Sequence, residues 1–368
     1  MGQDIVLVLL VAVALAFDFT NGFHDTANAM ATSIATRALP PKVAVGLSAT
    51  LNFVGAFISL KVAATIAANI VDAAAITPTI ILAGLLGGIF WNLLTWRLGL
   101  PSSSSHALIG GIVGAVLVAA GSGAVFADGV VGKVLVPAAV APLLCLGAAA
   151  TATFIVYRLI RGRPREELHR GFRLGQIASA SLVSLAHGTN DAQKTMGVIT
   201  LALISNGNLS GPHPGVPAWV VVSAATAIAL GTYTGGWRII RTVGHRITGL
   251  EPPQGFAAEM SSAATIVSAT NAGFPLSTTH VTSGGVMGAG VGKRARDVHW
   301  DVVARMATAW VLTLPAAGAL AAVFYLVTRA LGTDVAGPLM VSALAAVGAA
   351  ALYVETHRSR DRVTAADV

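Results

Sequence analysis

The sequence predicts an all-α polytopic membrane protein with two inverted-topology repeats, each containing a broken helix and a re-entrant hairpin. The first observation is composition: 55% of the residues are hydrophobic and only 11% are charged, whereas soluble domains carry about 25% charged residues. The second is that several apolar segments approach the roughly 20 residues that a helix needs to cross a bilayer. The third is that basic residues gather in loops between these segments, as they do on the cytoplasmic side of membrane proteins.

The apolar segments are almost free of charge, and we expect them to lie in the bilayer: 43–60, 79–94, 134–156, 219–231, 307–327 and 338–354. The first residues, "DIVLVLLVAVALAFDF", lack a basic start and a small-residue cleavage site, so they predict a retained helix and not a signal peptide. The net charge of +7 follows from the basic loops, and we expect no nucleic-acid partner.

Loop charge predicts the topology. The most basic segment, 157–173, is placed in the cytoplasm, and one crossing then leads to the loop 205–217, which has no Lys, Arg, Asp or Glu. The next two basic loops, 238–246 and 292–300, must both be cytoplasmic. The apolar segment between them therefore enters and leaves on the same side, as a re-entrant hairpin with "PLSTTH" at its tip.

The first half is predicted to be the mirror image of the second. Because 36–42, "TRALPPK", is basic and the N-terminus carries Asp4 but no basic residue, we expect the N-terminus outside and the C-terminus in the cytoplasm. The segment from about 79 to 120 must then enter from the outside and return there, with "PSSSSH" at its tip. The protein is thus expected to be a multi-pass protein of the cell (inner) membrane.

Two motifs occur once in each half, in the same order. "PSSSSHALIGGIVGA" (101–115) aligns without gaps on "PLSTTHVTSGGVMGA" (275–289), and "NGFHDTAN" (21–28) aligns on "HGTNDAQK" (187–194). We therefore expect repeat 1 over 4–157, a basic cytoplasmic linker over 158–172, repeat 2 over 173–331 and an extra transmembrane helix over 337–354. Inverted repeats with broken helices and a site at the membrane midplane are typical of secondary transporters.

Together, "NGFHDTANAMATSIATRA", "GLPSSSSHALIGG", "HGTNDAQKTMG" and "PLSTTH" resemble the inorganic phosphate transporter (Pit) family, bacterial low-affinity type, over nearly the whole chain. The resemblance implies a secondary active symporter, not an enzyme, that imports inorganic phosphate with a cation (H⁺ or Na⁺) by alternating access. It also implies one central site formed by asparagine and aspartate from the broken helices and by hydroxyls from the hairpin tips. No cofactor is implied beyond the transported ions.

Phosphate has several acceptor oxygens and negative charge, so its site needs donors. The expected donors are the tip hydroxyls, the backbone N–H groups at the start of the helix behind each tip, and Lys194. A helix cap needs only one hydroxyl, yet both tips carry several. The predicted phosphate-binding residues are Ser102, Ser103, Ser104, Ser105, Ser277, Thr278, Thr279 and Lys194.

Buried aspartates would repel phosphate unless a cation lies beside them. Carboxylate and amide oxygens suit a hard cation such as Na⁺ at Asp25, and a protonated carboxyl would serve H⁺ coupling instead. The alternative is that an aspartate only caps a half-helix. The predicted coupling-cation residues are Asp25, Asn21, Asn28, Asp191 and Asn190.

Lys194 occupies the place of Asn28 in the other repeat. It lies three residues after Asp191, so the two share one helix face. It can act as a built-in cation, contact phosphate, or form a structural ion pair. Arg97, before the first tip, is either a phosphate ligand or a paired structural residue, and His24 is a candidate for proton coupling.

Other functions are compatible with parts of this pattern. A symporter of another tetrahedral oxyanion such as sulfate and a passive anion channel are the alternatives, and an intramembrane hydrolase is disfavoured because the chain has no HExxH motif and no P-loop. The expected partners are inorganic phosphate, the coupling cation, the lipid bilayer and a second copy of the chain in a homodimer. The glycine pairs Gly110/Gly114 and Gly284/Gly288 are expected to let the hairpins pack closely on the broken helices.

Overall fold

The computed structural model describes residues 2–162, 164–210, 215–358 and 363–368. Over these residues the chain is helical, with isolated bridges as the only β pairing. Five of the described helices are long and apolar enough to cross a membrane, or six if one bent pair is a single span. The predicted class, an all-α polytopic membrane protein, is confirmed.

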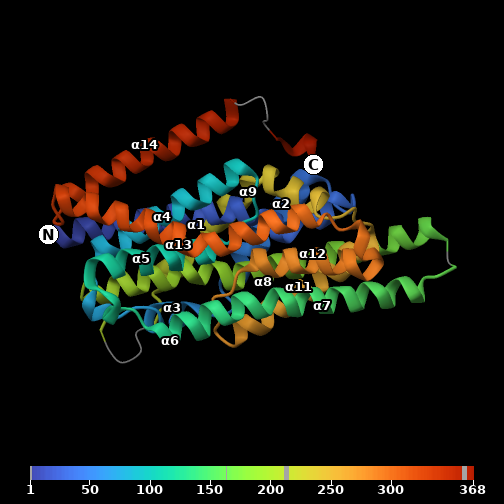
Figure 1. Cartoon of the computed structure of the whole chain (residues 1–368), viewed down its shortest axis with the longest axis horizontal. Helices are drawn as coiled ribbons and strands as arrows, with labels where there is room; N and C mark the ends of the chain where they lie inside the picture. Colours follow the sequence, from blue (N-terminus) through green and yellow to red (C-terminus); the bar gives the residue numbers. More distant parts are fainter. Residues whose placement is uncertain (1, 163, 211–214, 359–362) are drawn as a thin grey trace.

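The first half of the chain runs from α1 to α7, and the second half from α8 to α14. The first comprises α1 (Gly2–Ala35), α2 (Pro41–Gly55), α3 (Lys61–Asn69), α4 (Pro78–Leu98), α5 (Ser104–Ala120), α6 (Ala127–Val130) and α7 (Val136–Leu159). The second comprises α8 (Arg165–Ser205), α9 (Ala218–Thr234), α10 (Trp237–Arg241), α11 (Pro252–Asn271), α12 (Thr278–Arg294), α13 (Trp300–Leu331) and α14 (Ala336–Arg358). In Figure 1 the N-terminal end of α1 lies at the left, α7 and α8 are joined at the far right, and α14 follows the upper edge.

The basic linker is shorter than 158–172 would suggest, because α7 ends at Leu159 and α8 already begins at Arg165. The linker residue 163 lies outside the described residues. Acidic Glu166 and Glu167 occupy the first turn of α8, where they interact favourably with the helix dipole and help to begin the helix early.

The expected breaks in the first helix of each half are wrong. Both α1 and α8 run without interruption through the motifs 21–28 and 187–194. Neither helix contains a proline, which would remove a backbone donor and kink the helix. The break instead lies at Gly235, whose φ is +73°, where α9 meets α10 at an angle of 62°.

Each half contains a helical hairpin, α4–α5 in the first and α11–α12 in the second. The loop before each returning helix ends in a serine N-cap: Ser103 accepts a hydrogen bond from the backbone N–H of His106 (3.1 Å), and Ser277 accepts one from that of His280 (3.2 Å). The tips meet inside the protein, where the rings of His106 and His280 lie 4.8 Å apart. The two copied motifs therefore face each other.

The hairpins pack on the closing helix of the opposite half, and not on α1 and α8 as the glycine pairs had suggested. A Cβ added to Gly114 of α5 would lie 2.3 Å from the carbonyl oxygen of Gly318 in α13. A Cβ added to Gly288 of α12 would lie 2.2 Å from the carbonyl oxygen of Leu146 in α7. These glycines are needed because the helix backbones touch at these points.

Candidate ion and phosphate site

The motifs of both halves meet in the middle of the protein. The centres of α1 and α8 contribute the residues of 21–28 and 187–194, and the N-termini of α5 and α12 contribute the hairpin tips. Nearly all of their polar side chains are less than a tenth exposed. Residues from four separate segments of the chain thus form one buried polar centre.

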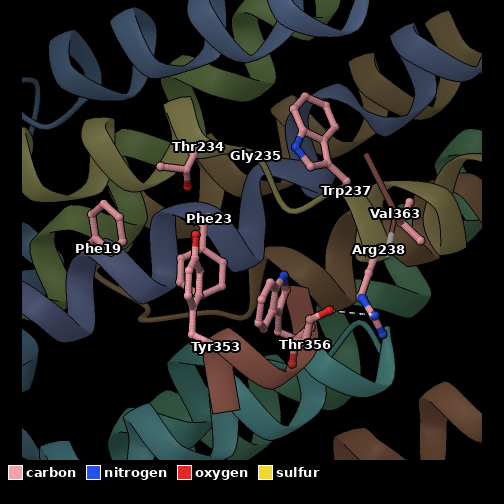
Figure 2. Close-up of a pocket in the computed structure, with 10 residues that line it drawn as sticks. Phe19, Phe23, Thr234, Gly235, Trp237, Arg238, Tyr353, Thr356 and Val363 are labelled. Atoms are coloured by element: carbon pink, nitrogen blue, oxygen red, sulfur yellow. Dashed lines mark hydrogen bonds between the residues drawn. The ribbon is translucent and has the colours of Figure 1, made fainter. Parts of the chain in front are cut away.

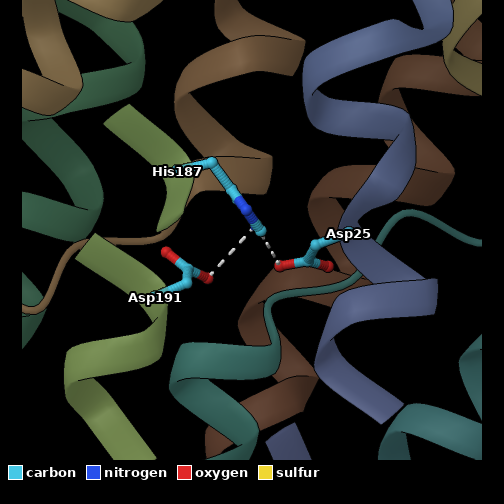
Figure 3. A group of neighbouring side chains, drawn as sticks. All are labelled: Asp25, His187 and Asp191. Atoms are coloured by element: carbon cyan, nitrogen blue, oxygen red, sulfur yellow. Dashed lines mark ion pairs between the residues drawn. The ribbon is translucent and has the colours of Figure 1, made fainter. Parts of the chain in front are cut away.

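The two aspartates of the copied motifs face each other across His187. Nε2 of His187 lies 4.0 Å from Asp25 Oδ2 and 3.6 Å from Asp191 Oδ2, and Figure 3 shows the imidazole between the two carboxylates. One ligand atom from each of the three residues fits within 4.8 Å of the others. A cation at this position, or the charged form of His187, can interact with both carboxylates at once.

Hydrogen bonds orient this group from the surrounding helices. Nδ1 of His24 lies 2.7 Å from Asp25 Oδ1, and its Nε2 lies 3.2 Å from the Thr95 hydroxyl of α4. Nδ1 of His187 lies 3.2 Å from Asn52 Oδ1 of α2. Each histidine is therefore held at one nitrogen by a neutral side chain and presents the other to a carboxylate.

Lys194 pairs with Asp191, as their spacing along the helix predicts. The ammonium donates to Asp191 Oδ1 at 2.7 Å and to the Ser105 hydroxyl of the first tip at 2.5 Å. The side chain is 1% exposed, so its ammonium group interacts with buried groups of the centre and not with solvent. It links α8 to the first hairpin.

The second tip contacts both aspartates. The hydroxyl of Thr278 donates to Asp191 (3.3 Å), and that of Thr279 donates to Asp25 (3.4 Å). The Asn28 amide in turn donates to the hydroxyls of Thr278 and Thr279, at 3.3 and 3.0 Å. Asn28, Thr278 and Thr279 therefore form a bridge between α1, α12 and the carboxylates.

The four serines of the first tip have different surroundings. Ser102 lies against Thr313 (2.8 Å) and accepts from the Trp91 indole, away from the aspartates. Ser103 is the N-cap of α5, as Ser277 is of α12. Ser105 meets Lys194, and the buried hydroxyl of Ser104 has no hydrogen-bond partner among the described residues. Ser105 also donates to the Leu276 carbonyl at 3.2 Å, so Ser104 has the one tip-serine hydroxyl that is left without a partner in the described part of the chain.

The remaining predicted cation residues are buried asparagines around the two aspartates. Asn190 donates to Thr270 (2.8 Å) and to the Phe274 carbonyl (3.2 Å), both away from Asp25. The amide oxygens of Asn21, Asn28 and Asn190 accept no hydrogen bond from the described part of the chain. Such buried acceptors are available to a cation.

Sequence reasoning missed His187, Asn52 and Thr95 as members of the site. His187 begins the second motif, where the first motif has Asn21, and the alignment could have indicated it. Asn52 and Thr95 lie outside both motifs. Arg97 is not in the centre, because its guanidinium makes a bidentate pair with Glu355 at 2.6 Å.

A cavity of about 240 Å³ lies among α1, α4, α10 and α14. Figure 2 shows Phe19, Phe23, Trp237, Arg238 and Tyr353 around it. Its lining residues Phe23 and Trp96 are the chain neighbours of His24 and Thr95, but neither His24 nor Thr95 lines the cavity. Aromatic rings line its wall, and the guanidinium of Arg238 provides a positive charge.

The comparisons with known proteins concern the chain as a whole. Residues 21–321 match the phosphate transporter family. A protein of Mycobacterium bovis named "probable low-affinity inorganic phosphate transporter" is 56% identical over 357 residues, which cover 97% of this chain and 85% of that relative. A protein of the same name from Bacillus subtilis is 45% identical over 325 residues, which cover 88% of this chain and 97% of that relative.

A solved structure named "The sodium-dependent phosphate transporter" has the same fold, with a TM-score of 0.78 at 23% identity. The match covers 89% of this chain and 99% of that one. The relatives are named as transporters, which confirms the expectation of a membrane transporter and not an enzyme. The chain belongs to the phosphate transporter family.

Proposed function

We propose that this protein is a secondary active symporter that imports inorganic phosphate together with a cation. One observation carries the proposal. The N-termini of α5 and α12 lie together beside two buried carboxylates, and Lys194 contacts both the first tip and one of these carboxylates. Anion donors and cation ligands in one buried centre are what coupled transport of an anion and a cation requires. The names of the relatives support phosphate as the anion.

Phosphate binds at the donors of the two tips in this proposal. Helix N-termini present free backbone N–H groups and a partial positive charge to an anion. Ser104 adds a hydroxyl donor that has no partner among the described residues. Ser105, Thr278 and Thr279 add hydroxyls that exchange their present acceptors for phosphate in this proposal, and Lys194 adds an ammonium that contacts Ser105. Ser103 and Ser277 serve as caps, and Ser102 supports the tip through Thr313.

The coupling cation binds between Asp25 and Asp191. The paired carboxylates would repel phosphate, so the cation must enter for the anion to bind well. Na⁺ is supported by the structural likeness to a sodium-dependent phosphate transporter and by the unpartnered amide oxygens of Asn21, Asn28 and Asn190. H⁺ carried by the Asp25–His24 pair is the alternative.

Alternating access between two inverted repeats is the proposed mechanism. The crossed packing of α5 on α13 and of α12 on α7 supports it, because each hairpin then moves with the other half. In this proposal the protein lies in the inner membrane of the cell. Its N-terminus is outside, and the connection between α7 and α8 is in the cytoplasm. The cavity beside Arg238 is then the route to the cytoplasm.

Uptake of radiolabelled phosphate into proteoliposomes tests this function. We expect accumulation above equilibrium under an imposed Na⁺ or H⁺ gradient, and loss of that accumulation in Asp25→Asn. Asp301→Asn is the matched control, because Asp301 is 67% exposed and forms an ion pair with Arg305 on its own helix. Flux that ignores both gradients would indicate a channel, and equal uptake of sulfate would indicate a general oxyanion carrier. Either result would contradict the proposal.

A further inference from the structure

Two cationic side chains occupy corresponding places in the two halves, each at the start of a short helix. Lys61 is the first residue of α3, and Arg238 is the second residue of α10. α3 follows α2, and α10 follows α9, after a short interruption of the helix. A threonine lies four residues after each cation, Thr65 in α3 and Thr242 directly after α10. In the proposed topology both cations lie at membrane depth, where ionisable side chains are costly and usually functional.

Both cations bind the same feature of the hairpin in the opposite half. The ammonium of Lys61 donates to the backbone carbonyl of Asn271 at 3.0 Å, and Nη1 of Arg238 donates to that of Arg97 at 2.8 Å. Asn271 and Arg97 are each four residues before the proline that opens a hairpin tip. Their carbonyls belong to the last turns of α11 and α4, where the helix dipole is negative and attracts a cation.

A glycine follows each of these carbonyls and lets the hairpin approach the cation closely. Gly99 and Gly273 have φ angles of +64° and +74°, the left-handed conformation that commonly ends a helix. A Cβ added to Gly99 would lie 3.8 Å from Cβ of Arg238, and one added to Gly273 would lie 3.8 Å from Cβ of Lys61. The two hairpins therefore dock on the two short helices in the same way.

We propose that Lys61 and Arg238 are positioning residues that hold the two hairpin tips around the phosphate site and are released in turn during transport. The contact of Lys61 with Asn271 is the outer clamp, and that of Arg238 with Arg97 is the inner clamp, because α3 leads to the outside and α10 to the cytoplasm in the proposed topology. This inference rests on the alternating access proposed above. Each cation binds a neutral carbonyl, so a clamp can open without leaving a buried carboxylate unpaired.

Each clamp borders a cavity, which gives the hairpin room to move. Lys61 and Asn271 line a cavity of about 560 Å³ between α2, α8 and α11. Arg238 lines the cavity of about 240 Å³ described above. A tip that is freed from its clamp can therefore shift without first displacing a packed core.

The inner clamp has further support. The hydroxyl of Thr242 donates to the Gly99 carbonyl at 2.8 Å, whereas that of Thr65 donates to the Lys61 carbonyl in its own helix at 3.2 Å. Nη2 of Arg238 also donates to the Thr356 carbonyl of α14 at 3.4 Å (Figure 2). The helix α14, which lies outside both repeats, thus braces the inner clamp.

Access to the centre from each side of the membrane tests the clamps. Ser104→Cys combined with Cys145→Ser carries a single thiol, placed at the centre. A membrane-impermeant thiol reagent is added to right-side-out or inside-out membrane vesicles, and the labelling rate is measured. Lys61→Gln should raise the rate from the outside several-fold and lower the rate from the cytoplasmic side. Arg238→Gln should do the reverse, because loss of one clamp shifts the population toward the state that is open on that side.

Matched variants separate the clamps from a general loss of stability. Lys61→Arg and Arg238→Lys keep a cation and should label nearly as the wild type does. Arg305→Gln is the control for removing a positive charge, because Arg305 is 62% exposed and pairs with an aspartate on its own helix. Thr242→Val removes a bond to the hairpin and should increase labelling from the cytoplasmic side, whereas Thr65→Val removes none and should not change it.

The clamps and the symport can fail separately. Labelling that changes in the same direction in Lys61→Gln and Arg238→Gln, or in neither, would overturn the clamps, and gradient-driven phosphate uptake would then leave the proposed function intact. If the two glutamine variants do not fold, equal labelling of Thr242→Val and Thr65→Val would overturn the inner clamp. Opposite changes without coupled uptake would support the clamps and contradict the symporter. Opposite changes with the two sides exchanged would support the clamps and contradict the proposed orientation.

Discussion

Ser103 and Ser104 are adjacent in the first hairpin tip, yet they should respond to alanine substitution in opposite ways. The hydroxyl of Ser104 is buried and has no described partner within the protein, so removing it breaks no hydrogen bond among the described residues. If it donates to phosphate, its loss should cost about 1.5–3 kcal/mol, the usual range for a hydrogen bond to a charged group. That range corresponds to a roughly ten- to hundredfold weaker affinity for phosphate.

The hydroxyl of Ser103 is instead used by the fold, because it accepts from the backbone N–H of His106 at 3.1 Å. Ser103→Ala should therefore lower the free energy of unfolding by about 1 kcal/mol, the usual cost of a lost N-cap, and change phosphate affinity little. Ser104→Ala should leave the melting temperature unchanged.

Both variants can be measured side by side. Initial rates of phosphate uptake in proteoliposomes give the KM, and thermal unfolding in detergent gives the melting temperature. Wild-type KM in Ser104→Ala would refute the assignment of Ser104 to the phosphate site. A loss of affinity in Ser103→Ala as large as that in Ser104→Ala would show that the two serines act through the same local structure.

Three further predictions concern the lysine pair, helix packing and pH. Asp191→Asn should reduce phosphate uptake more than the double variant Asp191→Asn with Lys194→Gln does, because a lone buried lysine is less favourable than a neutral pair; equal rates would contradict this. Gly288→Ala should reduce the yield of folded protein in size-exclusion chromatography, because its Cβ would lie 2.2 Å from a carbonyl oxygen. Gly147→Ala is the control, because its Cβ would meet no atom within 4 Å, and it should leave the yield unchanged. Burial acts to raise the pKa of Glu251 at the start of α11, but hydrogen bonds from a tyrosine and a lysine outweigh it, and the pKa lies below its ordinary value of 4.5. The stability that Glu251 contributes is therefore present above pH 4.5 and lost as pH falls through the lowered pKa, so melting temperatures across acidic pH should fall less steeply in Glu251→Gln than in the wild type.

The class of the protein and the residues of its proposed site could both be predicted from the chain's own pattern of residues. Composition and the length of the apolar segments predicted membrane-spanning helices, because the bilayer constrains both. The copied motifs singled out Asp25, Asp191 and both hairpin tips, which the fold brings together. The pair of Lys194 with Asp191 followed from helix periodicity, which is a local property.

The breaks expected in α1 and α8 rested on analogy with other transporters, and the local sequence did not support them. Asn, Gly and Thr in 21–28 and 187–194 suggested unwound backbone by analogy with other transporters. Without a proline, however, the helix keeps its hydrogen bonds, and the hydroxyl of Thr26 adds a bond to the Gly22 carbonyl at 2.8 Å. The ligands of the proposed cation site are therefore side chains and not freed carbonyls.

Which polar side chains meet depends on contacts between segments that are far apart in the chain. Asn28 bonds Thr278, 250 residues away, and His187 lies between carboxylates from opposite halves. The role of each tip serine also depends on such contacts, because Ser102, Ser103 and Ser104 have the same chemistry and differ only in what faces them. The spacing of residues along a helix determines which side chains share a face, but the partner across that face is set by the packing of segments far apart in the chain.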